Sequence, residues 1–327
     1  MLSYRELMRR TDAPPGSAWG LHGSNDQIGT INFITPESVK HAASLVRKGM
    51  TFNLDCALDA FTLPHRPKIK HVIHGKEQHF TRDDYVDNFY LQSSTQVDGL
   101  RHFRHPVHGF YNFTRAEDVK VGAGRLGIEH YAERAIAGRG VLLDIERYLA
   151  SNDKTLDLEN GEAFGIDLLE AVAKAENVSF RPGDILMLRT GWLNAYFHKF
   201  DQTQRGRLAA RIAAPGLAQS HESLEWLWDH QFSIIAADTP GFEAVPPVPT
   251  SPFPELLKGV DGLSPRMAAM MHPFLIAMLG FCLGELWNLD GLAQDCAADG
   301  AYDMMVTVKP LNLPGGVGSP ANVIAIK

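Results

Sequence analysis

The chain has 327 residues, of which 45% are hydrophobic and 21% charged, and its formal net charge at pH 7 is −7. These values predict a folded globular protein. They argue against a general binder of nucleic acid or anionic membranes, which is normally basic.

The three cysteines are few and odd in number, which disfavours a disulfide framework and favours a reducing compartment. The N-terminus lacks the apolar core of a secretory signal, and no run of 18 apolar residues occurs. We therefore expect a soluble, cytoplasmic protein with a small-molecule substrate and no nucleic-acid or membrane partner.

The first elements follow from local signals. Residues 1–34 are rich in Gly, Pro and Asn and predict an irregular lead-in. Thr35-Pro36-Glu37 predicts the start of a helix that runs to about Lys48, because it combines a hydroxyl cap, a first-position proline and an acid. Residues 50–56 predict a strand. Residues 61–83 are polar and rich in His and Lys, which predicts a solvated loop, with a substrate lid as the alternative.

Later in the chain, short apolar runs predict strands. They lie at residues 85–91, 141–145, 184–189, 232–237, 281–287, 303–308 and 323–327. Helices are expected at residues 220–230, from 264 and at 272–280, and the six prolines of residues 240–254 predict a loop. Strands outnumber helices and do not alternate strictly with them, so we predict an α+β fold in a single domain spanning residues 1–327.

One polar cluster follows the strand expected at 85–91. Gln92, Gln96, Asp98 and His102 are spaced by four, two and four residues. The spacing is typical of a metal-binding or catalytic cluster, although glutamine is a poor metal ligand. Taken alone, Asp98 before Gly99 also fits a turn, and His102 fits a structural histidine.

Acidic residues downstream strengthen the case for a site. Asp238 stands where an apolar strand ends and Glu243 follows it, so both fit either a site or a loop cap. Glu285 lies within the apolar stretch Phe-Cys-Leu-Gly-Glu-Leu-Trp. A buried carboxylate there needs a cation, a hydrogen-bond donor or a raised pKa, unless the strand has one wet face. His272 lies thirteen residues before it, at an expected helix start.

These residues resemble the cyclase family, which includes bacterial kynurenine formamidases and isatin hydrolases and has the signature H-x-G-T-H-x-D-x-P-x-H. Thr95, Asp98 and His102 match it, whereas Gln92 and Gln96 stand at its two metal-binding histidines, Ser94 at its glycine and Leu100 at its proline. His272 and Glu285 match the downstream His and Glu of the family, and Gly29-Thr-Ile-Asn-Phe-Ile-Thr-Pro-Glu37 resembles its longer members.

The resemblance extends from about residue 19 to 290. It implies a swivelling β/β/α fold, a homo-oligomer (dimer or tetramer), and hydrolysis of an amide, lactam or ester-like bond with Zn²⁺ or Mn²⁺.

Two hypotheses follow for the centre. In the first, Asp98, His272 and Glu285 hold one divalent metal, and carboxylate and amide oxygens would favour Mn²⁺ or Mg²⁺ over Zn²⁺. In the second, the site is metal-free, and the side-chain amides of Gln92 and Gln96 stabilise an oxyanion. His102 is the expected general acid/base, and Asp98, Asp238, Glu243 and Glu285 remain alternatives for the acid that orients it.

The substrate is expected to be a small cyclic or linear amide, lactam or lactone. Expected binding residues are Phe103, Phe110 and Glu243, and other aromatic residues that either line the pocket or belong to the core are Tyr111, Trp192 and Phe242. Two alternatives stay open: a non-catalytic ligand-binding relative, and a dehydratase or true cyclase on the same scaffold.

Overall fold

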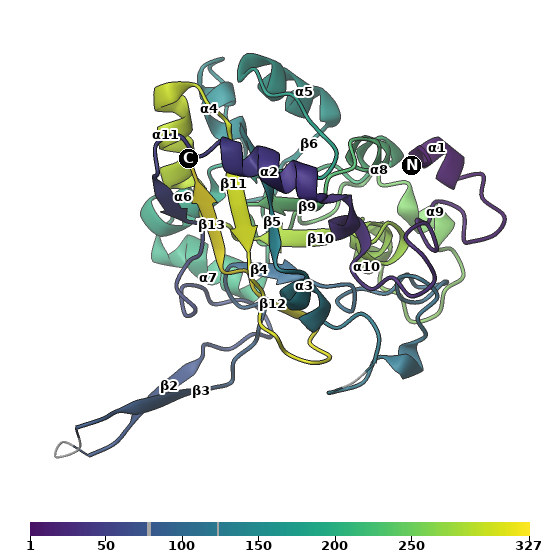
Figure 1. Cartoon of the computed structure of the whole chain (residues 1–327), viewed down its shortest axis with the longest axis horizontal. Coiled ribbons are helices and arrows are strands. Elements are labelled where there is room, and N and C mark those ends of the chain that lie inside the picture. Colours follow the sequence, from purple (N-terminus) through teal and green to yellow (C-terminus); the bar gives the residue numbers. More distant parts are fainter. Residues whose placement is uncertain (77–79, 123) are drawn as a thin grey trace.

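A nine-stranded mixed sheet forms the centre of the protein in the computed structural model, which describes residues 1–76, 80–122 and 124–327. The strands follow the order β1 (Thr51–Asn53), β13 (Val323–Ile326), β11 (Asp303–Val308), β5 (Ile136–Asp144), β7 (Ile185–Arg189), β9 (Ile234–Ala237), β10 (Cys282–Glu285), β4 (Gln96–Asp98) and β12 (Gly318–Pro320). Mixed helix and strand content around this sheet confirms the α+β class (Figure 1).

The four central strands β5, β7, β9 and β10 run parallel, whereas their neighbours on both sides pair antiparallel. These central strands are mostly apolar and almost wholly buried, as expected for strands covered on both faces. The connections between them carry α4 (Ile145–Ala150), α5 (Ile166–Ala175), α6 (Trp192–His198), α7 (Gln202–Ala210), α8 (His221–Asp229), α9 (Phe253–Leu256), α10 (Pro265–Ala269) and η3 (Pro273–Met278).

The remaining elements complete the layers. They are α1 (Tyr4–Leu7), η1 (Gly29–Phe33), α2 (Pro36–Ser44), η2 (Ala116–Asp118), α3 (Glu129–Arg134), α11 (Asp290–Asp299) and the short pair β6 (Ala163–Phe164) and β8 (Gly216–Leu217). Helix α2 starts at the expected cap: the Thr35 hydroxyl accepts from the Ser38 backbone N–H, and Ser38 returns the bond. This helix crosses β5 and β11 (Figure 1). No helix among the described residues is both long and apolar enough to cross a bilayer.

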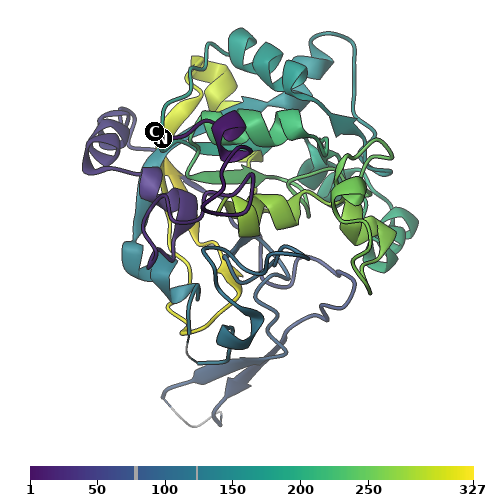
Figure 2. The same cartoon turned by 90° about the vertical axis from the view of Figure 1, so that its right-hand side faces the viewer.

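The prediction of a loop at residues 61–83 is wrong for its second half, where the chain forms a strand. Strands β2 (Lys70–His74) and β3 (Asp83–Asp87) pair antiparallel into a hairpin that projects from the body, here called the arm (Figures 1 and 2). Its polar composition suggested a loop, but a ribbon with both faces in solvent has no buried face to show in the sequence. The part of the expected loop at residues 77–79 lies outside the described residues.

Candidate active site

Two adjacent strands bring the predicted cluster together. Strand β4 carries Gln96 and Asp98, and it pairs antiparallel with β10 so that Gln96 lies opposite Glu285. Residues two apart on a strand share a face, so Gln96, Asp98 and Glu285 point to the same side. His272 arrives from the start of η3, immediately before β10.

Asp98, His272 and Glu285 form a compact buried cluster. One potential ligand atom from each lies within 4.8 Å of the others, and His272 Nε2 is 3.1 Å from Glu285 Oε1. Both carboxylate oxygens of Asp98 are buried and have no hydrogen-bond partner among the described residues. Burial, and then the charge of Glu285, raise the pKa of Asp98 well above its usual range. Two neighbouring buried acids of this kind are stabilised either by a proton on Asp98 or by a cation between them.

Glu243 contacts His272 at Nδ1, the ring nitrogen that does not face Glu285. It is fully buried and bonded to His272 Nδ1. It also accepts hydrogen bonds from the backbone N–H groups of Met271 (2.6 Å) and His272 (2.7 Å) and from Gln219 Nε2 (2.6 Å). This contact fixes a proton on Nδ1 and directs Nε2 toward Asp98 and Glu285, as in the carboxylate–histidine pairs of metal sites.

The charge balance of the cluster favours a cation whether or not a metal is bound. Burial acts to lower the pKa of His272, but its contacts with Glu243 and Glu285 outweigh burial and raise this pKa to about 10. The imidazole therefore holds a proton between the carboxylates when nothing else supplies positive charge. Two carboxylates and one imidazole nitrogen are a donor set that divalent metals accept. Such an ion would also give the two buried Asp98 oxygens the partner that they lack.

His102 stands between this cluster and the surface. Its Nε2 lies 3.7 Å from Asp98 Oδ2, and 19% of its side chain is exposed. Burial lowers the pKa of His102 to about 4, although the charge of Glu285 acts in the opposite direction. A cation bound nearby would lower this pKa further, so His102 is neutral at pH 7 and can accept a proton.

A cavity of about 320 Å³ opens beside His102, a size suited to a small ligand. The Phe103 ring, on its wall, lies 5.1 Å from the ring of His272. The lining residues combine apolar side chains with one arginine and one aspartate: His102, Phe103, Arg104, Pro106, Val260, Asp261, Gly262, Leu263, Met267 and Pro273.

The two glutamines differ in their surroundings. Gln96 Nε2 donates to Glu285 Oε2 at 2.5 Å, while Gln96 Oε1 is buried and has no partner among the described residues. Gln92 is half-buried, and its backbone carbonyl accepts a hydrogen bond from Arg66. Its side chain lies against Gly318, where an added Cβ would come within 2.7 Å of Gln92 Nε2. The structure thus brings Gln96 into the cluster, and no bond within the described residues joins the Gln92 side chain to it.

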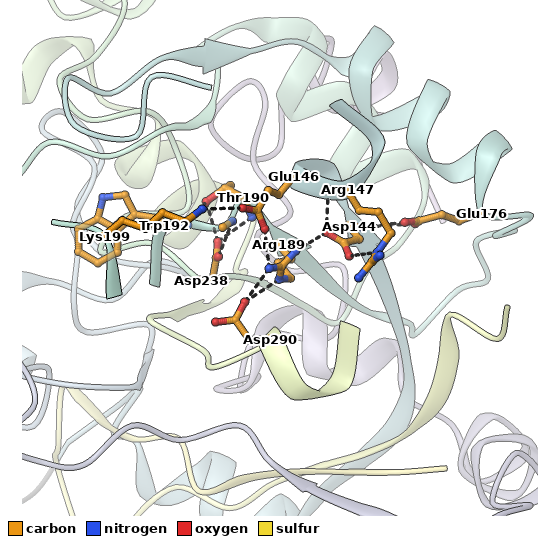
Figure 3. A network of polar contacts seen from close by, with 11 residues as sticks. Asp144, Glu146, Arg147, Glu176, Arg189, Thr190, Trp192, Lys199, Asp238 and Asp290 are labelled. Carbon is orange, nitrogen blue, oxygen red and sulfur yellow. Dashed lines mark hydrogen bonds and ion pairs between the residues drawn. The ribbon is translucent and has the colours of Figure 1, made fainter. Parts of the chain in front are cut away.

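Asp238 belongs to a separate polar network (Figure 3). Its carboxylate accepts from the backbone and hydroxyl of Thr190, both at 2.8 Å, and from the Gly191 N–H at 2.9 Å. In the same network Arg189 joins Asp144 to Asp290 across the ends of β5, β7 and α11. Asp238 therefore caps the turn after β7, and of the four alternatives the acid nearest to His102 is Asp98.

The other predicted binding residues are distributed differently. Only Phe103 lines the cavity; Phe110 packs half-buried on the core, and Tyr111, Trp192 and Phe242 are fully buried. Glu243 faces His272. Sequence reasoning missed Gln219, which lies in an unremarkable stretch, and Arg66, whose charge lowers the pKa of Asp98 and of Glu285. Neither carries a local signal, because both reach the site through tertiary folding.

A family model described as "Putative cyclase" matches residues 53–244. A crystal structure of a novel cyclase is 30% identical, with a TM-score of 0.79, covering 95% of this chain and 99% of its own. No curated protein matches the sequence.

Isatin hydrolases are among the similar structures. Isatin hydrolase A from Labrenzia aggregata, bound to benzyl benzoate, is 17% identical, with a TM-score of 0.56 and coverage of 87% of this chain and 94% of its own. Isatin hydrolase A from Ralstonia solanacearum is 16% identical, with a TM-score of 0.56, and the match covers 88% of this chain and 94% of that enzyme. This likeness lies in the fold and, with the cyclase structure, confirms the expected family fold.

Proposed function

Because the chain belongs to the cyclase family, we propose that it hydrolyses a small cyclic or linear amide, lactam or lactone. The observation that carries the proposal is the buried cluster of Asp98, His272 and Glu285 beside a neutral histidine at the edge of a cavity. Isatin hydrolases share the fold, which makes the cyclic amide isatin the first compound to test.

Asp98, His272 and Glu285 would hold one divalent ion, with Glu243 fixing the imidazole from behind. The two carboxylates favour Mn²⁺ or Mg²⁺, and the imidazole also suits Zn²⁺. A divalent ion in this place supplies positive charge that polarises a carbonyl oxygen and makes water more acidic.

The chain's own residues handle the proton. His102 lines the cavity and is neutral at pH 7, so its Nε2 can take a proton from the attacking water as general base. Asp98, 3.7 Å away, then stabilises the imidazolium that forms. His102 returns the proton to the leaving nitrogen or oxygen. Gln96 keeps the Glu285 carboxylate in place through its 2.5 Å hydrogen bond.

The test is turnover of a panel of small lactams, lactones and N-acyl amides, isatin included, by protein loaded with Mn²⁺ or Zn²⁺. Hydrolysis adds one water to the product mass. His102→Ala should lower kcat by about 10²- to 10⁴-fold while the metal content stays unchanged. His108→Ala is the matched control, since this exposed histidine stacks on His105 and does not line the cavity.

Other outcomes would contradict the proposal in distinct ways. A product of unchanged mass, or one that has lost water, would indicate an isomerase or dehydratase on this scaffold. Saturable binding without turnover would indicate a ligand-binding relative. Equal rates for His102→Ala and His108→Ala would remove His102 from the chemistry.

A further inference from the structure

Arg66 is a half-buried cation in the segment that leads from the body into the arm. One N–H of its guanidinium donates to the backbone carbonyl of Gln92, and no acid within the described residues forms an ion pair with it. Burial acts to raise the pKa values of Asp98 and Glu285, and the Arg66 charge acts in the opposite direction on both. Such an effect needs a short separation, so Arg66 lies near the two carboxylates without contacting either.

The Gln92 side chain lies on the same face of the sheet as the cluster. Gly318 of β12 pairs directly with Asp98 of β4, and directly opposite residues of antiparallel strands point their side chains to the same face. A Cβ added to Gly318 would come within 2.7 Å of Gln92 Nε2, so the Gln92 amide fills the space beside Asp98 that a larger residue would take. No described residue accepts a hydrogen bond from this amide, which leaves its two N–H groups for a ligand.

The donors of these two side chains suit one kind of ligand. A guanidinium presents five N–H groups in a planar fork that matches a carboxylate, and the Gln92 carbonyl takes one of them. Because Arg66 is bonded to Gln92 itself, the fork and the Gln92 amide lie close together. A half-buried cation is stabilised by an anion, and Asp98 and Glu285 cluster with His272 instead. The arrangement therefore fits a carboxylate that comes from outside the chain.

We propose that Arg66 and Gln92 bind a carboxylate group of the substrate and so determine specificity. The inference rests on the proposed hydrolase function: the scissile carbonyl lies at His102, while the acid group lies on the guanidinium and the Gln92 amide. It narrows the substrate class to amides, lactams and lactones that carry a carboxylate. A neutral compound such as isatin is then hydrolysed with a higher KM than an analogue that carries the acid.

Calorimetric titration with benzoate and with its neutral isostere benzamide tests the site without turnover. The wild type should bind benzoate at least about tenfold more tightly than benzamide. Arg66→Met should abolish this preference, and Arg66→Lys should recover part of it, because lysine keeps the charge but not the fork. Gln92→Met leaves the backbone carbonyl that anchors Arg66 and should weaken benzoate binding about three- to tenfold. Arg115→Met, which removes an exposed arginine paired with Glu117, should leave benzoate binding unchanged.

Kinetics then show whether the site serves the reaction. N-acetylglycine and 5-oxoproline, each compared with its own carboxamide, form pairs that differ only in the acid group. The acid should have the higher kcat/KM, and Arg66→Met should remove the difference by raising KM.

Three results would overturn the proposal: equal affinity of the wild type for benzoate and benzamide, benzoate binding that Arg66→Met and Gln92→Met leave unchanged, or acids that are no better substrates than their carboxamides. Benzoate binding that depends on Arg66, in a protein that hydrolyses no amide or lactone, would instead confirm the anion site and reject only the hydrolase function.

Discussion

Replacing Glu243 with glutamine is the sharpest test of how the candidate centre is held. The Glu243 carboxylate accepts four hydrogen bonds: from two backbone N–H groups, from Gln219 and from the His272 ring. A carboxamide keeps one oxygen and turns the other position into an NH₂ group. That group then faces two N–H donors that have no acceptor.

Two effects follow from this single change. Each buried donor without a partner costs about 1–3 kcal/mol, so the two donors left by Glu243→Gln should lower the free energy of unfolding by about 2–6 kcal/mol. His272 also loses the acceptor that fixes the proton on Nδ1, so Nε2 is no longer reliably free to bind a cation. Metal affinity should fall about 10- to 100-fold, the usual effect of losing such a partner.

The two effects are measured separately. Urea denaturation of the metal-free protein gives the stability change, and calorimetric titration with Mn²⁺ gives the affinity change. Glu225→Gln is the control, because Glu225 is a partly exposed partner of Arg5 and should change unfolding by less than about 1 kcal/mol. Wild-type metal affinity in folded Glu243→Gln protein would refute the role assigned to Glu243.

Three further predictions concern neighbouring groups. Gln96→Ala removes the donor that orients Glu285 and should lower kcat about 10- to 100-fold in steady-state assays, and an unchanged rate would exclude Gln96 from the machinery. Burial opposes protonation of His272, but Glu243 and Glu285 outweigh it and raise the pKa of His272 to about 10. Because an imidazole must be neutral to bind a metal, His272 has to lose this proton first. Mn²⁺ affinity should therefore rise about tenfold per pH unit between about pH 6 and 9, with proton release seen calorimetrically, and a pH-independent affinity would contradict this. Asp238→Ala should lower unfolding free energy by about 2–4 kcal/mol in urea melts and leave metal content unchanged, whereas loss of metal would place Asp238 in the site.

Capping residues and apolar runs in the sequence correctly predicted those helices and strands that depend on residues close together in the chain. The capping sequence at Thr35 gave the start of α2, and the apolar runs at 184–189 and 232–237 became β7 and β9. The resemblance to the cyclase family predicted that Asp98 and Glu285 belong to one cluster, and the pairing of β4 with β10 brings the two residues together.

Other features depend on contacts that spacing does not encode. Glu243 was expected near the substrate, yet it reaches His272, 29 residues further along the chain. Asp238 had the sequence context of a site residue, but its carboxylate accepts hydrogen bonds from Thr190 and Gly191 at the end of the neighbouring strand β7. The arm was hidden because both of its faces are polar enough to resemble a loop.

The most direct test of the account is the metal content of untagged protein, purified without added metal or chelator and measured by elemental mass spectrometry. The account predicts about one divalent ion per chain in the wild type, lost in an Asp98→Asn, Glu285→Gln double variant that remains folded. A folded wild-type protein that carries no metal and takes up neither Mn²⁺ nor Zn²⁺ would contradict it.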